Sequence, residues 1–269
     1  MMKLKWRVGV CLAVALFVQP MMAESPPPFA DFSAKRVKAP PKGAKPKIDV
    51  QITIQDTVVT VSKPQSSEGA SSTPGQYGWF WDEISPDIAE SGGGRLEPAL
   101  IRLSRPPEGQ GVKAPRLQSL LEIAQKHGTD ILIATVGTQV SPALVLAMIA
   151  VESSGDKDAQ SGAGAQGLMQ LMPVTSQRFD VEDPFDSAQN IKGGVAFLEI
   201  LMSSFDRDPI LVLAGYNAGE NAVRKANGVP EYAETRDYVP KVLVAYSVAR
   251  GLCRTPPQLI TDGCVFALN

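Results

Sequence analysis

Histidine is almost absent from this 269-residue sequence, which contains a single one, His127. A Ser-His-Asp triad and a histidine-rich metal centre both need imidazole groups, so the sequence argues against both. We expect His127 to be a surface residue where a helix ends. An excess of charge of one sign is also missing, because 26 Lys and Arg residues nearly balance 28 Asp and Glu residues. Without a basic excess, nucleic acid is not expected as a partner.

Apolar runs long enough to cross a bilayer are missing as well. The N-terminal apolar stretch, residues 8–18, is too short to span and follows a basic start at Lys3, Lys5 and Arg7. We therefore predict a secretory signal peptide over residues 1–23 and a periplasmic location for the exported protein. An uncleaved anchor is the alternative interpretation of this stretch.

Cysteine is scarce, with three residues in all, and Cys11 lies inside the predicted signal peptide. Export would leave Cys253 and Cys264 in an oxidising compartment, where we expect them to form a disulfide in a C-terminal tail, residues 253–269. A reactive or metal-binding pair is the alternative, but no His or further Cys supports it. No metal or cofactor is expected.

The segment from 24 to 115 has the composition of a linker followed by a small N-terminal region. Proline is frequent up to about residue 47, and residues 48–61 then alternate as a strand or hairpin would. Residues 77–81 form an aromatic cluster, which we expect to pack a small N-terminal subdomain onto the rest, although stacking on sugar rings is the alternative. Three consecutive glycines, 92–94, are expected to form a flexible joint.

From Arg116 onward, apolar residues recur at helical spacing and no strand pattern is found. The fold class is therefore predicted to be mainly α, with a compact helical domain over residues 116–252. Ser141 and Pro142 are expected to begin one helix as its N-cap and first residue. The expected helices span residues 117–127, 131–136, 142–152, 168–178, 186–205, 209–216, 220–226 and 235–250.

Glu152 is the strongest candidate for a catalytic side chain. It ends a run of nine apolar residues, 143–151, and an ionised carboxylate is costly to desolvate. Such an environment raises the pKa of a glutamate, and a carboxyl group that keeps its proton near neutral pH can act as a general acid. A glutamate at a helix end is more often a solvated surface residue, so Glu152 alone does not define a site.

Four motifs that include Glu152 follow one another in the sequence. They are Glu152-Ser153, Gly-Leu-Met-Gln-Leu-Met-Pro at 167–173, Gly-Tyr-Asn-Ala-Gly at 215–219, and Glu-Thr-Arg-Asp-Tyr-Val at 234–239. Together they resemble the soluble lytic transglycosylase catalytic domain, a lysozyme-like family that cleaves peptidoglycan. The resemblance runs from about Leu117 to about Arg250. It implies a lysozyme-like helical catalytic domain, and it leaves residues 24–115 outside.

The resemblance also implies a role for each matching residue. Glu152 would be the catalytic acid and base, and Ser153 would help to orient the site. Tyr238 would bring its hydroxyl near the glutamate. The remaining matches would line the sugar groove or lie beside the active site; they are Gln170, Met172, Tyr216 and Asn217. The alternatives are ordinary ones: a core position for Met172 or Tyr216, a solvated position for Gln170, and a helix stop at Asn217.

The reaction implied by the resemblance needs one carboxylate where most glycosidases use two. None of the four motifs supplies an obvious second one, which fits cleavage of the MurNAc–GlcNAc β-1,4 bond with formation of 1,6-anhydro-MurNAc ends. The substrate would be the glycan strands of peptidoglycan, and the enzyme is expected to be a monomer. A goose-type lysozyme-like hydrolase and a non-catalytic cell-wall-binding scaffold are the alternatives. The N-terminal region could then dock onto an envelope-spanning apparatus.

Overall fold

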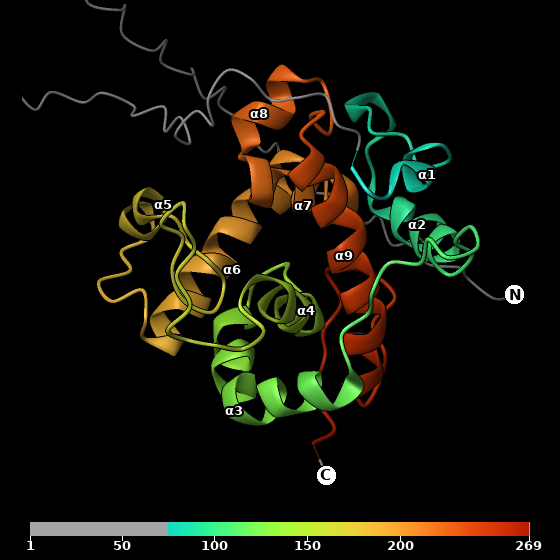
Figure 1. Ribbon diagram of the computed structural model, residues 1–269. Helices are drawn as coiled ribbons and strands as arrows, with labels where there is room; N and C mark the ends of the chain where they lie inside the picture. The colour runs from blue at the N-terminus through green and yellow to red at the C-terminus, as the bar shows by residue number, and fades with distance from the viewer. Residues whose placement is uncertain (1–74, 269) are drawn as a thin grey trace, which may run out of the picture. The chain divides into compact units, whose positions relative to one another are not determined.

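The computed structural model describes residues 75–268, and the regular secondary structure in this part of the chain is helical (Figure 1). Extended backbone pairs there only as isolated bridges. The prediction of a mainly α fold is confirmed. The predicted signal peptide, the proline-rich linker and the strand at 48–61 lie outside the described residues. The helices are α1 (Gly78–Trp81), α2 (Leu96–Leu103), α3 (Leu117–Thr135), α4 (Pro142–Glu152), α5 (Pro173–Arg178), α6 (Ser187–Ser204), α7 (Pro209–Ala218), α8 (Glu220–Lys225) and α9 (Ala233–Ala249), with short 3-10 turns at Ile88–Glu90, Gly93–Arg95 and Arg250–Leu252.

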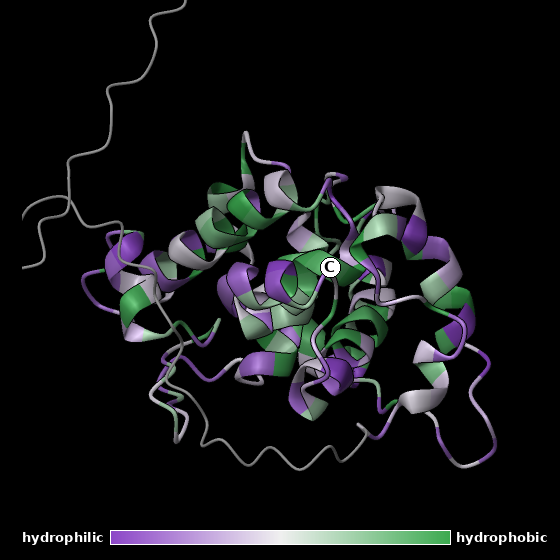
Figure 2. Cartoon of the chain, turned by 90° about the horizontal axis from the view of Figure 1, so that it is seen from above, coloured by the Kyte–Doolittle hydropathy of each residue, from purple (hydrophilic) through white to green (hydrophobic). Residues whose placement is uncertain are grey.

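The centre of this helical body is α4. Every residue from Pro142 to Ile149 is buried, because the helix is apolar on all sides. It packs against α3 and α9, which lie beside it in Figure 1. Figure 2 shows hydrophobic residues gathered toward the middle of the body and hydrophilic ones toward its periphery. A helix buried in this way can place its last residue, Glu152, at the edge of the core.

Two of the predicted helices begin at an aspartate that caps them. The Asp186 carboxylate accepts a hydrogen bond from the Gln189 amide at the start of α6. The Asp208 carboxylate accepts from the amides of Ile210 and Leu211 at the start of α7, where Pro209 occupies the first position. At α4 the predicted proline is in place, but the Ser141 side chain makes no capping bond.

The predicted helix end at His127 is wrong. Helix α3 continues through Gly128 to Thr135 and joins two segments that the sequence analysis separated. The imidazole is buried, with 3% of the residue exposed, and this burial lowers the pKa of His127. Gly128 lies against the ring of Phe266, so packing by the C-terminal segment favours a continuous helix where local propensity favours a stop.

The predicted helix over 168–178 is also wrong in its first half. Helix α5 begins only at Pro173, and the preceding residues form a turn in which Gly167 and Gln170 have positive φ angles of 75° and 49°. The glycine run at 92–94 enters a 3-10 turn, Gly93–Arg95, and the Gly92 amide donates to the Asp208 carboxylate. This anchored turn replaces the predicted flexible joint.

The aromatic cluster packs into the core, as expected. Tyr77, Trp79 and Phe80 are buried, and the Trp81 Nε1 donates to the carbonyl of Arg236 on α9 at 3.0 Å. The Arg102 guanidinium of α2 lies 4.6 Å from the centroid of the Trp79 ring. These contacts hold α1 and α2 against α9.

The C-terminal segment ends close to the helical body. The sulfur atoms of Cys253 and Cys264 lie 2.01 Å apart, within bonding distance. The Tyr246 hydroxyl of α9 donates to the Leu259 carbonyl between them in sequence, at 2.9 Å. Within residues 75–268, none of the helices combines the length and hydropathy that a membrane crossing requires.

Asp208 gives a test of this architecture. Its carboxylate is fully buried and accepts from Arg95 at 3.1 Å, from the Gly92 amide and from two amides of α7. Asp208→Ala is expected to lower the free energy of unfolding by about 3 kcal/mol, because it leaves the arginine and the helix amides without their acceptor. Urea denaturation measures the change. Glu97→Ala on the exposed face of α2 serves as the control, and equal effects of the two changes would contradict the role given to Asp208.

Candidate active site

Glu152 is the last residue of α4 and is half-buried. Its Oε1 accepts a hydrogen bond of 2.6 Å from the hydroxyl of Tyr238, which lies on α9 with 6% of the residue exposed. The pair therefore spans the contact between the two helices that form the centre of the fold. A short bond to a carboxylate of this kind fixes the direction of the carboxyl group.

A second tyrosine belongs to the same site. The Tyr216 hydroxyl, near the end of α7, donates to the Met169 carbonyl at 2.9 Å. Burial raises the pKa of both Tyr216 and Tyr238 well above the usual value, and the negative charge of Glu152 raises both further. Both phenols therefore stay protonated and act as hydrogen-bond donors over the physiological pH range.

Ser153 connects the end of α4 to the turn at 166–171. Its hydroxyl donates to the Leu168 carbonyl at 2.8 Å and lies 3.2 Å from the Ile149 carbonyl. The Gly155 amide donates back to the Ser153 Oγ. The serine thus links the turn to the end of α4 that carries the glutamate.

The turn itself depends on a glycine and a buried asparagine. A Cβ atom at Gly167 would overlap the Pro184 carbonyl and the side chain of Asn190, so only glycine fits. The Asn190 side chain, fully buried on α6, accepts from the Met169 amide and donates to the carbonyls of Gln166 and Pro184. All the polar atoms of this amide that face the turn are used to hold its shape.

Gln170 and Met172, predicted to line a sugar groove, lie on this turn and just after it. The Gln170 Nε2 donates to the carbonyls of Ala159 and Gly167, at 3.1 and 3.0 Å, so its amide nitrogen supports the turn. Met172 is half-buried and occupies the N-cap position of α5.

Asn217 joins the end of α7 to the start of α9. Its Oδ1 accepts from the Thr235 hydroxyl at 2.7 Å, and its Nδ2 lies 3.3 Å from a carboxylate oxygen of Glu234. Thr235 precedes Tyr238 by one helical turn, so Asn217 fixes the end of the helix that carries the tyrosine. Its neighbour in sequence is Tyr216, which bonds to Met169, so hydrogen bonds connect all four motifs in one network.

Tyr238 donates directly to Glu152, whereas Ser153 and Tyr216 donate to the Leu168 and Met169 carbonyls of the turn that also carries Gln170. Two residues of the network were missed in the sequence, Asn190 and Thr235. Asn190 has a weak sequence signal, as a polar residue on the apolar face of α6, whereas Thr235 lies within the motif at 234–239 without having been given a role. Within residues 75–268, no group of three or more His, Cys, Asp or Glu side chains is arranged to hold a metal ion.

Comparison with known proteins adds a family. Residues 131–239 match the family profile described as the Transglycosylase SLT domain, and all four motifs lie within the match. This segment is a transglycosylase SLT domain. The resemblance inferred from the motifs is therefore confirmed, and the SLT domain contains Glu152, both tyrosines and the turn at 166–171.

Two curated relatives illustrate the match. The chain is 39% identical over 124 residues to the membrane-bound lytic murein transglycosylase F of Desulfosudis oleivorans, covering 44% of this chain and 25% of that protein. It is 38% identical over 106 residues to the transglycosylase of Enterobacteria phage PRD1, covering 39% and 37%. The chain therefore spans well under half the length of these relatives.

Among solved structures, the 70 kDa soluble lytic transglycosylase of Escherichia coli aligns with a TM-score of 0.45 and 24% identity. The alignment covers 52% of this chain and 27% of that one.

Asn190→Ala tests the construction of the turn. Removing the amide leaves the Met169 N–H and the Pro184 carbonyl without this partner and takes one of two donors from the Gln166 carbonyl, at an expected cost of about 1–3 kcal/mol in unfolding free energy. Amide exchange measured by mass spectrometry should accelerate in peptides that cover residues 166–171. Asn221→Ala, on the exposed face of α8, should leave that exchange unchanged. Unaltered protection in the Asn190 variant would show that the turn does not depend on this side chain.

Proposed function

We propose that the protein is a lytic transglycosylase that cleaves the MurNAc–GlcNAc β-1,4 bond of peptidoglycan, with Glu152 as the single acid and base. The observation that carries the proposal is the position of Glu152, half-buried at the end of α4 and held by the Tyr238 hydroxyl at 2.6 Å. The SLT domain and the names of its relatives support the reaction class.

In the first step, protonated Glu152 donates its proton to the glycosidic oxygen, and the bond from that oxygen to C1 of the muramyl ring breaks. Tyr238 holds Oε1, so the carboxyl group keeps one orientation toward the substrate. The raised pKa of Tyr238 ensures that the phenol donates to the carboxylate that the transfer produces. This hydrogen bond therefore strengthens as charge develops on Glu152.

In the second step, the substrate supplies the nucleophile. The N-acetyl group of the muramyl sugar stabilises the positive charge at C1, and ionised Glu152 takes the proton of the C6 hydroxyl. The C6 oxygen then bonds to C1 and closes a 1,6-anhydro ring, so no water enters the product. Because the attack is intramolecular, correct orientation can contribute a large part of the rate.

The other residues position the glycan. Ser153 and Asn190 fix the turn beside Glu152, and we assign Gln170 and Met172 to the wall of the sugar groove. Since the Gln170 Nε2 is bonded to the turn, its Oε1 would accept from a sugar hydroxyl or amide. Tyr216 and Asn217 hold the neighbouring ends of α7 and α9.

The location of the enzyme follows from its substrate, which lies outside the cytoplasmic membrane. We propose a periplasmic protein that is exported by residues 1–23 and closed at its C-terminal end by a Cys253–Cys264 disulfide. The bonding distance of the two sulfur atoms supports this pairing. A monomeric state and docking of the N-terminal region to an envelope-spanning apparatus stay predictions.

Glu152→Gln is expected to reduce release of soluble muropeptides from purified sacculi by about 10²–10⁴-fold, because the amide cannot exchange the proton. The thermal unfolding midpoint should stay close to that of the original protein. Glu182→Gln, at an exposed loop position, is the matched control and should retain full activity. Turnover by the Glu152 variant at the original rate would exclude this residue as the acid.

The products separate transglycosylation from hydrolysis. Mass spectrometry of muropeptides released by the active protein should show 1,6-anhydro ends, since the C6 oxygen replaces water as the nucleophile. Products one water heavier, with reducing ends, would show that the enzyme is a hydrolase and would contradict the second step.

Tyr238→Phe removes only the hydroxyl that holds Glu152. Loss of one hydrogen bond to a charged group corresponds to about 1.5–3 kcal/mol, and thus to a fall of about 10–100-fold in cleavage rate. Tyr246→Phe on the same helix removes a hydroxyl that bonds the Leu259 carbonyl, and it should leave the rate unchanged. Equal rates for the two variants would contradict the role of Tyr238.

A further inference from the structure

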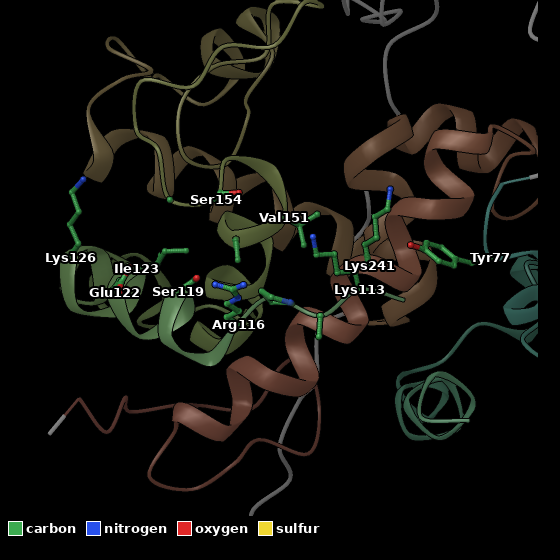
Figure 3. Close-up of a pocket in the computed structure, with 14 residues that line it drawn as sticks. Tyr77, Lys113, Arg116, Ser119, Glu122, Ile123, Lys126, Val151, Ser154 and Lys241 are labelled. Atoms are coloured by element: carbon green, nitrogen blue, oxygen red, sulfur yellow. The ribbon is translucent and has the colours of Figure 1, made fainter. Parts of the chain in front are cut away.

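A pocket of about 630 Å³ lies beside the end of α4, and Glu152 itself is not among its lining residues. Its walls come from the segment 113–116, the first half of α3, the residues on either side of Glu152 and one side chain of α9. Figure 3 shows Lys126 and Tyr77 at opposite ends of the pocket, with Arg116, Lys113 and Val151 between them.

The pocket is strongly basic. Four cationic side chains line it, Lys113, Arg116, Lys126 and Lys241, against the single carboxylate of Glu122. The Glu122 Oε1 accepts from the Gln118 Nε2 at 3.0 Å. Among residues 75–268, the ion pairs do not include any of these four cations. Unpaired cations around one pocket attract an anion, because their fields add.

The pocket adjoins the proposed catalytic pair. Val151 and Ser154, which line it, flank Glu152 in sequence, and Lys241 follows Tyr238 by three residues on α9. Residues three apart on a helix share a face about one turn apart. An anionic branch of a substrate bound at Glu152 would therefore reach the pocket without a long spacer.

The floor of the pocket is apolar and closely packed. Ile123 and Ala150 line it, and Gly155 lies so near Ile123 that an added Cβ would come within 2.6 Å of its Cγ1. Gly155 also has a φ of 84°, a conformation that glycine adopts at little cost. The loop after Glu152 is thus packed against α3. The pocket therefore combines an apolar floor with a basic rim.

All four cations lie outside residues 131–239, the part that matches the SLT domain. Three come from the segment that precedes the match and one from α9 beyond it. The cations of the pocket therefore come from parts of the chain that flank the family match, whereas its lining residues from 150 to 155, which surround Glu152 in sequence, lie within that match.

We propose that this pocket binds the carboxylates of the peptide stems that branch from the muramyl sugars of peptidoglycan. The inference rests on the proposed function, because that function places the muramyl C1 at Glu152. The peptide stem is attached to the same muramyl sugar, so its carboxylates lie close to the pocket when that sugar is bound at Glu152. Guanidinium and ammonium groups bind carboxylates through charge-assisted hydrogen bonds, and the apolar floor suits the aliphatic parts of the stem.

The test compares two substrates and two variants. The substrates are glycan strands that carry peptide stems and the same strands stripped of stems by an amidase. Arg116→Gln combined with Lys241→Gln removes two pocket cations, and Lys192→Gln combined with Lys225→Gln removes two exposed lysines of α6 and α8. The pocket variant should need about 10-fold more stem-bearing substrate for half-maximal rate. With stripped strands, the pocket variant should need the same substrate concentration as the original protein. The control variant should need the same concentration as the original protein for both substrates.

Three outcomes overturn the inference. In the first, the pocket variant needs no more stem-bearing substrate than the control variant does. In the second, its substrate requirement rises equally for both substrates, which would show that the pocket binds the glycan or supports folding. In the third, the pocket variant loses binding to vesicles of anionic lipid that a soluble stem peptide does not displace, which would assign the pocket to a membrane surface.

Failure of the proposed function gives a different pattern, since the original protein would then cleave neither substrate. In that case, calorimetry with a soluble stem peptide and the Glu152→Gln protein tests binding to the pocket independently of cleavage. Binding that weakens about 10-fold with Arg116→Gln and Lys241→Gln supports the inference, and an absence of binding overturns it.

Discussion

The structure depends on one constraint: α4 is buried on every side, and its last residue is a glutamate. Burial of the apolar run from Pro142 to Ile149 fixes the helix between α3 and α9, so Glu152 has little freedom to move away from the core edge. The Tyr238 hydroxyl then selects the orientation of the carboxyl group. The turn held by Ser153 and Asn190 completes the surroundings. Stability of the core and geometry of the site are therefore achieved by the same contacts.

Much of the helical framework could be predicted from the sequence, because its signals are local. The Ser141-Pro142 helix start and the patterns of apolar residues predicted α4, α6 and α7 to within a few residues. Two errors share a physical cause. Helix α3 passes through Gly128, where the Phe266 ring packs, and the turn at 166–171 takes a helix-like sequence out of the helix, because Asn190 supplies partners for its backbone. Contacts from distant segments decide both cases, and no local pattern reports them.

The sequence predicted which residues belong to the candidate site better than it predicted how they are arranged. Motif resemblance selected Glu152, Ser153 and Tyr238, which the structure joins through bonds within one network. It gave Gln170 a groove position, whereas the structure shows that its amide nitrogen also supports the turn. Asn190 could not be selected in advance, since its role exists only when α6 approaches the turn. The basic pocket was equally hidden, because only the fold brings Lys241 of α9 to the three cations of residues 113–126.

The central claim is that the scissile glycosidic bond is bound at the carboxyl group of residue 152. A crystal structure of the Glu152→Gln protein soaked with a stem-bearing glycan fragment tests it most directly. The account predicts that the oxygen between MurNAc and GlcNAc lies about 3 Å from the side chain of residue 152, within hydrogen-bond distance. A glycan bound in a productive groove elsewhere, with no glycosidic oxygen near that side chain, would contradict the account.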